Sequence, residues 1–291
     1  MDDVLRRMPV IVLALASLAV SVSSLAPLQA RPSQNTEPPA AQAVLSLVEQ
    51  EAFLANARVV RTRGVATGVT ATLRATLTDG RVTHDASIQR VDEFKARFEG
   101  LRGTEFNFRD TWRHNVAAYR LDRLLDLGMI PPSVERNYHG KPAAFTWWVD
   151  DVLMDEAARL KKKIPAPDSR RWYEQMWHVR LFDQLIYNVD RNLGNLLIDT
   201  EWRIWMIDHS RAFRLFDTPR ALENIAQCDR AVFERLKALD APTLSATMRG
   251  YLTSPEMSAM LKRRDVIVQH LEKTNALFDW QRPVRPWLQL Q

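Results

Sequence analysis

The chain has 291 residues and a formal net charge of +5, and 46% of its residues are hydrophobic. A hydrophobic share of this size excludes a wholly disordered chain, and the single cysteine, Cys228, excludes a fold held together by internal disulfides. Apart from the run "RLKKKIP" at 159–165, the basic residues are interspersed with acidic ones. They do not alternate with aromatic residues, so nucleic acid is not a predicted partner. A mildly basic surface is compatible with anionic ligands or an anionic membrane face.

The first 30 residues predict an export signal. Two arginines precede an apolar run at 8–20, and small residues follow it up to Ala30. This run is shorter than the roughly 20 apolar residues that a spanning helix needs, which favours a signal peptide over residues 1–30. An uncleaved membrane anchor is the alternative. We therefore expect a periplasmic or extracellular protein, with a proline-rich disordered linker at 31–42.

The first globular lobe is expected at 43–150. Helical spacing predicts a helix over 41–57. Runs rich in Val, Thr and Ile, separated by glycines, then predict antiparallel strands at about 57–63, 69–77 and 82–91. A helix at about 109–127 and a hairpin around His139-Gly140 complete a small sheet of about five strands with one inserted helix.

The second lobe, expected at 151–291, is mainly helical. A strongly amphipathic helix is predicted at 170–189, and later helices are predicted at about 219–226, 229–239, 243–251 and 255–280. Between them lies the segment "NVDRNLGNLLIDTEWRIWMIDHS", residues 188–210, which predicts a hairpin with its turn at 199–201. The two lobes together predict an α+β fold.

Three polar residues flank this predicted hairpin. Asp190 and Asn195 precede its first strand, and Asp208 follows its second strand. Because a hairpin brings its ends together, we expect the three side chains to converge. An amide oxygen and a carboxylate suit Mg²⁺ or Mn²⁺, and the other carboxylate can accept the proton of a hydroxyl nucleophile. The constellation therefore indicates phosphoryl transfer.

Other interpretations of these residues are less favoured. Each of the three also fits an Asx-turn or a helix cap. His209 and Ser210 follow Asp208 directly, but consecutive residues cannot form a catalytic relay, and the sequence contains no Gly-x-Ser-x-Gly elbow of a hydrolase. The six histidines show no spacing typical of a zinc site, and His209 is expected to pack or hydrogen-bond rather than bind metal.

The spacing in "DRNLGN" and "IDHS" resembles that of the protein-kinase-like superfamily, whose metal-binding Asp follows the Asn of the catalytic loop by 13 residues. The Asp-Arg order is similar to that of phosphoinositide-kinase-like and atypical kinases. "NVAAYRLDRLLDLGMIPPSVER" resembles a helix of the secretory Golgi casein kinase group (family with sequence similarity twenty), and the loop also resembles exported bacterial proteins. The resemblance covers about 57–216. It implies a bilobal fold, with a small antiparallel β lobe carrying one inserted helix and a mainly helical lobe.

The resemblance also implies roles for individual residues. Asp190 would be the catalytic base, and Asn195 and Asp208 would hold the metal that accompanies ATP or another nucleoside triphosphate. Gly64 and Gly68 in "GVATGVT" would lie over the phosphates, although the motif departs from Gly-x-Gly-x-x-Gly and also fits a loose hairpin turn.

The hinge beside the adenine would be "WWVD", residues 147–150, which includes Trp148 and Val149. The segment 211–216 would replace a long activation segment, so we expect a site that is arranged constitutively.

The chain departs from the family at an ion pair. Gln89 stands where the third strand should carry a lysine, and Asn115 stands where the following helix should carry a glutamate. The two changes belong together, because losing one member of a partly buried pair would leave the other charge unpaired. A Gln–Asn pair can instead hydrogen-bond without net charge. Arg90 or Lys95 would be the substitute cation.

Two functions remain open at this point. One is a phosphotransferase that acts on a hydroxyl of a protein, lipid or sugar. The other is a kinase-fold binding module, or pseudokinase, that binds a ligand or partner without transferring phosphate.

Overall fold

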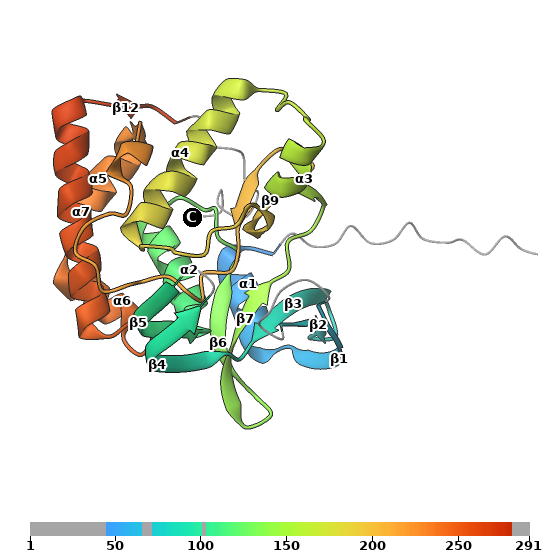
Figure 1. The fold of residues 1–291 in the computed structure, drawn as a ribbon. Helices are drawn as coiled ribbons and strands as arrows, with labels where there is room; N and C mark the ends of the chain where they lie inside the picture. The colour runs from blue at the N-terminus through green and yellow to red at the C-terminus, as the bar shows by residue number, and fades with distance from the viewer. Residues whose placement is uncertain (1–44, 66–71, 101–102, 281–291) are drawn as a thin grey trace, which may run out of the picture. The chain divides into compact units, whose positions relative to one another are not determined.

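The computed structural model describes residues 45–65, 72–100 and 103–280, and these lie in one compact unit. The expected signal peptide and linker lie outside the described residues, as does Gly68. The architecture is α+β, as predicted, with an antiparallel sheet in the N-terminal part and a mainly helical C-terminal part (Figure 1).

The N-terminal sheet has five antiparallel strands in the order β1-β2-β3-β7-β6. Their bounds are β1 Arg58–Gly64, β2 Leu73–Thr78, β3 Thr83–Gln89, β6 Ser133–Tyr138 and β7 Lys141–Trp147. Helix α1 (Leu47–Asn56) packs on one face, where Leu54, Leu77 and Phe145 are fully buried. The five predicted strands are confirmed, and the His139-Gly140 turn joins β6 to β7.

A further hairpin follows β3 in the chain and precedes helix α2 (Arg113–Leu125). Among the described strands, β4 (Asp92–Gly100) and β5 (Gly103–Thr111) pair only with each other. The prediction of a helix from about 109 was therefore wrong at its start, since residues up to Thr111 continue a strand. Most residues of the hairpin are exposed. Apolar residues alternate with polar ones at Phe94, Ala96 and Phe98, and again at Phe106 and Phe108, so a strand signal was present in the sequence and was missed.

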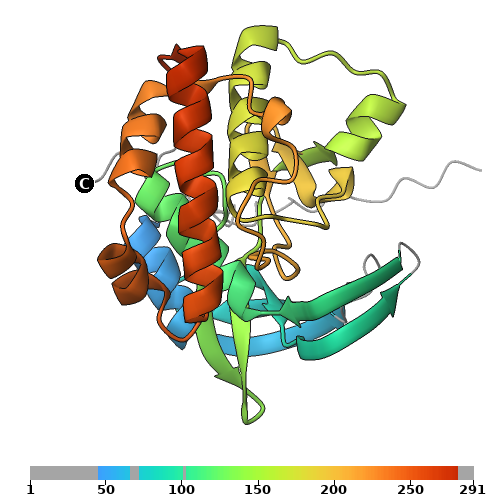
Figure 2. The same cartoon turned by 60° about the vertical axis from the view of Figure 1, so that its left-hand side comes forward.

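The C-terminal part packs helices around α4 (Ser169–Leu185). The other helices are α3 Glu156–Lys161, α5 Arg230–Ala238, α6 Ala241–Met248 and α7 Ser254–Thr274, and α4 and α7 lie side by side (Figure 2). A short parallel pair, β11 (Cys228–Asp229) and β12 (Leu277–Phe278), joins the segment after α7 to the start of α5. None of the described helices is long and apolar enough to cross a membrane.

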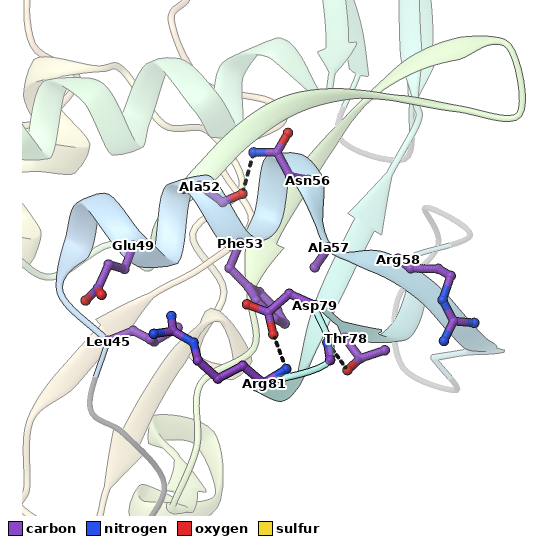
Figure 3. Close-up of a pocket in the computed structure, with 11 residues that line it drawn as sticks. Leu45, Glu49, Ala52, Phe53, Asn56, Ala57, Arg58, Thr78, Asp79 and Arg81 are labelled. Carbon is purple, nitrogen blue, oxygen red and sulfur yellow. Dashed lines mark hydrogen bonds between the residues drawn. The ribbon is translucent and has the colours of Figure 1, made fainter.

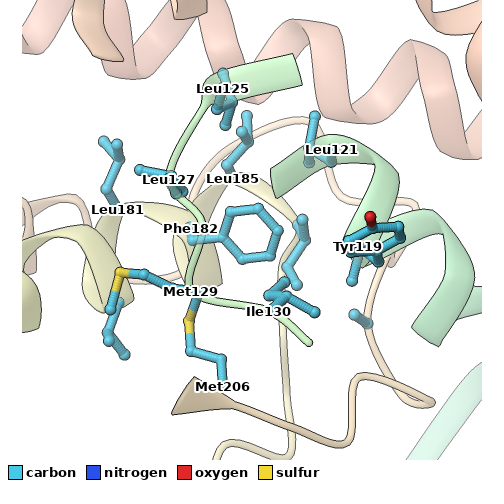
Figure 4. Close-up of a cluster of buried hydrophobic side chains, with 14 of the residues drawn as sticks. Tyr119, Leu121, Leu125, Leu127, Met129, Ile130, Leu181, Phe182, Leu185 and Met206 are labelled. Carbon is cyan, nitrogen blue, oxygen red and sulfur yellow. The ribbon is translucent and has the colours of Figure 1, made fainter. Parts of the chain in front are cut away.

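The main hydrophobic core links α2, α4 and the hairpin that carries the predicted site. Leu121 and Leu125 of α2 and Phe182 and Leu185 of α4 are fully buried together (Figure 4). Met206 of strand β10 (Ile204–Met206) packs in the same cluster, and its backbone N–H donates a 2.8 Å hydrogen bond to the carbonyl of Met129. Burial of each of these large side chains stabilises the fold by about 1.5–3 kcal/mol. It also fixes the hairpin relative to the helices.

The predicted hairpin is present. Strand β9 (Leu196–Asp199) pairs with β10, and the turn between them begins at Asp199. Strand β8 (Val152–Asp155), which was not predicted, pairs with the other edge of β9. Strand β9 is therefore the central strand of a three-stranded sheet in the order β10-β9-β8.

Candidate active site

Asp190 and Asn195 lie on the loop that follows α4, and neighbouring asparagines shape that loop. The side-chain oxygen of Asn188 accepts a 3.0 Å hydrogen bond from the backbone N–H of Asp190. Asn192 caps the 3₁₀ turn η1 (Leu193–Asn195) by accepting a 3.1 Å bond from the N–H of Asn195. The turn-forming roles are thus filled by Asn188 and Asn192, so the Asp190 carboxylate and the Asn195 amide remain available for a ligand.

Asp208 lies directly beside this loop. The backbone N–H of Ile207 donates a 3.0 Å hydrogen bond to the carbonyl of Asn195, which joins the two ends of the hairpin. Asp208 has a φ of 55°, a left-handed conformation that is uncommon for a residue other than glycine and recurs at functional sites. Its Oδ1 is buried and has no hydrogen-bond partner among the described residues.

A divalent cation fits this arrangement. A buried carboxylate oxygen without a donor costs free energy, and a cation on it would remove that cost. Among the described residues, no three His, Cys, Asp or Glu side chains are placed to bind a metal together. A cation would therefore depend on Asp208, on the Asn195 amide and on oxygens from water or substrate, as Mg²⁺ commonly does.

Arg191 is a residue of this site that the sequence analysis missed. Its guanidinium donates to Asp183 of α4, with Nε 2.9 Å from Oδ2 and Nη2 3.0 Å from Oδ1. Nη1 donates to the carbonyl oxygens of Asn195, at 3.2 Å, and of Ile207, at 2.9 Å. Arg191 therefore connects the end of α4 to the residue before Asp208, and it holds the predicted base and the predicted metal ligands in one frame.

His209 completes this frame and does not face a ligand. It is 1% exposed, and its Nε2 lies 2.9 Å from Nη2 of Arg191, so the ring nitrogen accepts and the imidazole is neutral. Burial, together with the adjacent charge of Arg191, holds the pKa of His209 well below its ordinary value. This agrees with the prediction that His209 packs and hydrogen-bonds.

The expected lysine–glutamate pair is replaced by a pair of amides. Nδ2 of Asn115 donates a hydrogen bond to Oε1 of Gln89, as the sequence analysis expected. Oδ1 of Asn115 accepts a 2.7 Å bond from the backbone N–H of His209. The pair therefore joins β3, α2 and the loop of Asp208 without any charge.

Neither predicted substitute cation lies at this pair. The Arg90 guanidinium stacks over the ring of Tyr138, and the Lys95 ammonium forms a 3.1 Å ion pair with Glu93. Arg211 instead approaches the site from the segment after Asp208, with Nη1 3.8 Å from Oδ2 of Asp190.

The predicted hinge follows β7. The backbone N–H of Trp148 donates a 3.1 Å hydrogen bond to the carbonyl of Asp85 on β3, and Val149 is 9% exposed. The guanidinium of Arg74 lies 4.2 Å from the centre of the Trp148 ring and pairs with Asp85 at 2.6 Å. The sheet beside the predicted hinge is therefore polar and aromatic.

The glycine prediction stays open. Gly64 ends β1, and an added Cβ there would meet no atom within 4 Å, so its role over a phosphate remains a prediction. A cavity of about 580 Å³ lies elsewhere, between α1 and the turn at Asp79 (Figure 3). It contains none of the predicted site residues.

Comparisons with known proteins identify the fold. No protein-family model and no curated protein matches the chain in sequence. A solved structure of hydra Fam20 with sugar is similar, with a TM-score of 0.59, 16% identity, and coverage of 81% of this chain and 93% of that one. A structure of the Golgi casein kinase with Mn and ADP bound has a TM-score of 0.54 and 13% identity, covering 77% and 75%. Another structure of that kinase has a TM-score of 0.52 and 14% identity, covering 78% and 74%. The chain therefore has an atypical protein-kinase-like fold.

Proposed function

We propose that this protein is an exported kinase-like phosphotransferase that moves a phosphoryl group from a metal-bound nucleoside triphosphate to a hydroxyl acceptor. The observation that carries the proposal is the buried Oδ1 of Asp208, which has no partner among the described residues and lies beside the loop of Asn195 and Asp190. A fold of this kind with the same residues in a purely structural role would satisfy that oxygen with a donor.

The transfer uses few groups of the protein. The acceptor oxygen bonds to the terminal phosphorus as the bond from that phosphorus to the bridging oxygen breaks. The hydroxyl proton passes to the carboxylate of Asp190, and the electron pair of the broken bond stays with the nucleoside diphosphate. Asn195 and Asp208 would hold Mg²⁺ or Mn²⁺, which supplies charge neutralisation at the phosphates when bound.

The acceptor and the location are further parts of the proposal. A hydroxyl of a protein, lipid or sugar satisfies the chemistry equally well. Export rests on the signal-like sequence at 1–30, and association with an anionic membrane surface rests on the net positive charge.

A second candidate is a pseudokinase that binds a ligand or partner through the same fold. The neutral Gln89–Asn115 pair favours it, because the lysine that normally contacts the donor phosphates is absent. The two candidates differ in turnover, since both allow a metal and a nucleotide to bind.

The first experiment measures ATP binding by titration calorimetry with and without Mn²⁺, followed by phosphate transfer to casein and to simple sugars. We expect metal-dependent binding by the wild-type protein. Asp208→Asn should lose this dependence, yet it should be no less stable than wild type without metal, because the unpaired buried charge is gone. Asp190→Asn should bind ATP and fail to transfer phosphate.

The control is Asp279→Asn, since the Asp279 side chain is 90% exposed and lies away from the site. If the wild-type protein binds ATP and transfers no phosphate, the pseudokinase is the candidate that stands. Binding of ATP that is equal with and without metal, and unchanged in Asp208→Asn, would contradict the phosphotransferase, because its mechanism requires the metal at Asp208.

A further inference from the structure

The positive charge that a phosphate site needs is not supplied by strand β3 in this protein. Gln89 and Asn115 hydrogen-bond to each other, so the usual lysine position is neutral. Phosphoryl transfer depends strongly on positive groups that neutralise the oxygens of the transferred group. The carboxylates of Asp190 and Asp208 and one divalent cation together carry no net positive charge, so a triphosphate needs a further cation in the site.

Arg211, on the segment after Asp208, places a guanidinium beside Asp190. It follows Asp208 by three residues, and its Nη1 lies 3.8 Å from Oδ2 of Asp190. Its Nη2 donates a 2.8 Å hydrogen bond to Glu105 of β5, and its Cζ lies 5.0 Å from the centre of the Phe108 ring. The inserted β4–β5 hairpin therefore fixes the guanidinium next to the predicted base.

The Nη1 group of Arg211 keeps donors for a ligand. It lies 3.8 Å from Oδ2 of Asp190, which is too long for a hydrogen bond. The Nε atom is buried and is not one of these donors. The side chain is nevertheless 26% exposed, so a ligand in the site can reach it. Planar N–H groups of this kind bind two oxygens of a phosphate at once.

Arg214 is a matched neighbour with a different role. It lies on the same segment, pairs with the same Glu105 and stacks over the same Phe108 ring, at 5.6 Å. Its side chain is only 6% exposed, and within the described ranges it forms no ion pair with Asp190. Arg214 therefore anchors the β4–β5 hairpin, whereas Arg211 also faces the site.

We propose that Arg211 is a catalytic residue that binds the oxygens of the transferred phosphoryl group beside Asp190, in place of the lysine missing at position 89. This rests on the proposed function. The phosphorus–oxygen bond changes and the proton transfer to Asp190 stay as given above, and Arg211 keeps its own protons throughout. It contributes hydrogen bonds and positive charge, which strengthen as negative charge gathers on the transferred group.

The test compares Mn²⁺-dependent binding of ATP, ADP and AMP, and the rate of phosphate transfer, in wild type, Arg211→Gln, Arg211→Lys and Arg214→Gln. We expect Arg211→Gln to bind ATP about tenfold to a hundredfold more weakly, the loss of one or two charged hydrogen bonds, and AMP almost unchanged. Arg211→Lys should fall between the two. Arg214→Gln should keep the wild-type preference for ATP over AMP. Thermal unfolding midpoints identify any variant that fails to fold.

The outcomes distinguish a failure of the proposed function from a failure of the role of Arg211. If the wild type binds no nucleotide, the proposed function fails, and the role of Arg211 fails with it. If the wild type binds and transfers while Arg211→Gln keeps its ATP preference and rate, only the role of Arg211 is overturned. Equal losses for ATP and AMP, or equal losses in Arg214→Gln, would also overturn it, because they indicate a structural role.

Discussion

The side-chain amide of Asn115 donates a hydrogen bond to the amide oxygen of Gln89, at the two positions where a kinase-like site is expected to carry glutamate and lysine. Asn115 is 6% exposed and also accepts the backbone N–H of His209. A neutral pair thus preserves the connection between β3, α2 and the Asp208 loop. The connection does not require the charges that usually accompany it.

Because the two side chains are hydrogen-bonded, we expect substitutions at Gln89 and Asn115 to be coupled in a double-mutant cycle. Gln89→Lys and Asn115→Glu should each lower the free energy of unfolding by about 1–3 kcal/mol, because each introduces a partly buried charge without a partner. The double variant should recover most of this loss through an ion pair. Urea denaturation of the four proteins measures the coupling. Strictly additive losses in the double variant would show that the two side chains do not interact.

Much of the fold was predictable from local sequence. The strands around the Asp79-Gly80 and His139-Gly140 turns follow from β-branched residues punctuated by glycine, and both turns contain a glycine with positive φ. The β4–β5 hairpin carried a signal that was missed. Apolar residues alternate with polar ones at Phe94, Ala96 and Phe98, and again at Phe106 and Phe108, which is the spacing of a strand. Phe94 and Phe106 are nevertheless 66% and 69% exposed, so this spacing does not mark a buried face.

The candidate site was predictable only in part. Asp190, Asn195 and Asp208 lie within one short segment, and the predicted hairpin places the backbone before Asp208 beside Asn195. The convergence of the three side chains on a ligand stays a prediction. The role of Arg211 depends on Glu105, which is 106 residues away on the β4–β5 hairpin. Contacts over such distances follow from tertiary packing and leave no local pattern.

Arg191 and Asp183 give a second prediction. Both side chains are 11% exposed, and the guanidinium also holds two backbone carbonyls of the site loop. Arg191→Met should lower the free energy of unfolding by about 3–5 kcal/mol, since it leaves a buried carboxylate without its partner. The control is Arg97→Met, whose pair with Glu99 is 66% and 60% exposed, and it should change stability by about 0.5 kcal/mol or less. Similar losses in both variants, measured by denaturant unfolding, would contradict this role.

Glu256 predicts a pH dependence. Burial alone would raise the pKa of Glu256, but hydrogen bonds from His114 and Thr253 and the charge of Arg109 lower it from 4.5 to about 2. A depressed carboxyl pKa stabilises the fold fully above the unfolded value of 4.5, and this contribution is lost as pH falls from 4.5 toward 2. Its size is on the order of 3 kcal/mol.

The measurement compares the unfolding free energies of wild type and Glu256→Gln at pH 6, 4 and 3. The difference between them should be greatest at pH 6 and should shrink toward pH 3, because Gln cannot titrate. A constant difference across this range would assign the effect of Glu256 to packing instead of charge.

We expect Arg263 to limit local unfolding of the segment 211–216, which follows the site. Arg263 is fully buried, and its guanidinium donates to the carbonyls of Leu185, at 2.7 Å, of Arg214, at 2.9 Å, and of Phe216. Arg263→Met should lower the free energy of unfolding by several kcal/mol, about 1–3 for each carbonyl left without a donor. It should also speed proteolytic cleavage near Phe216, whose side chain is already 59% exposed.

The matched control is Lys262→Met, because Lys262 is the neighbouring residue on α7 but is 58% exposed in a surface pair with Asp217. Its cleavage rate should equal that of wild type. Limited proteolysis with chymotrypsin, which cuts after phenylalanine, compares the three proteins under native conditions. Rapid cleavage at Phe216 in the wild type would mean that the segment opens on its own, and the constitutively arranged site expected from its short length would then be wrong.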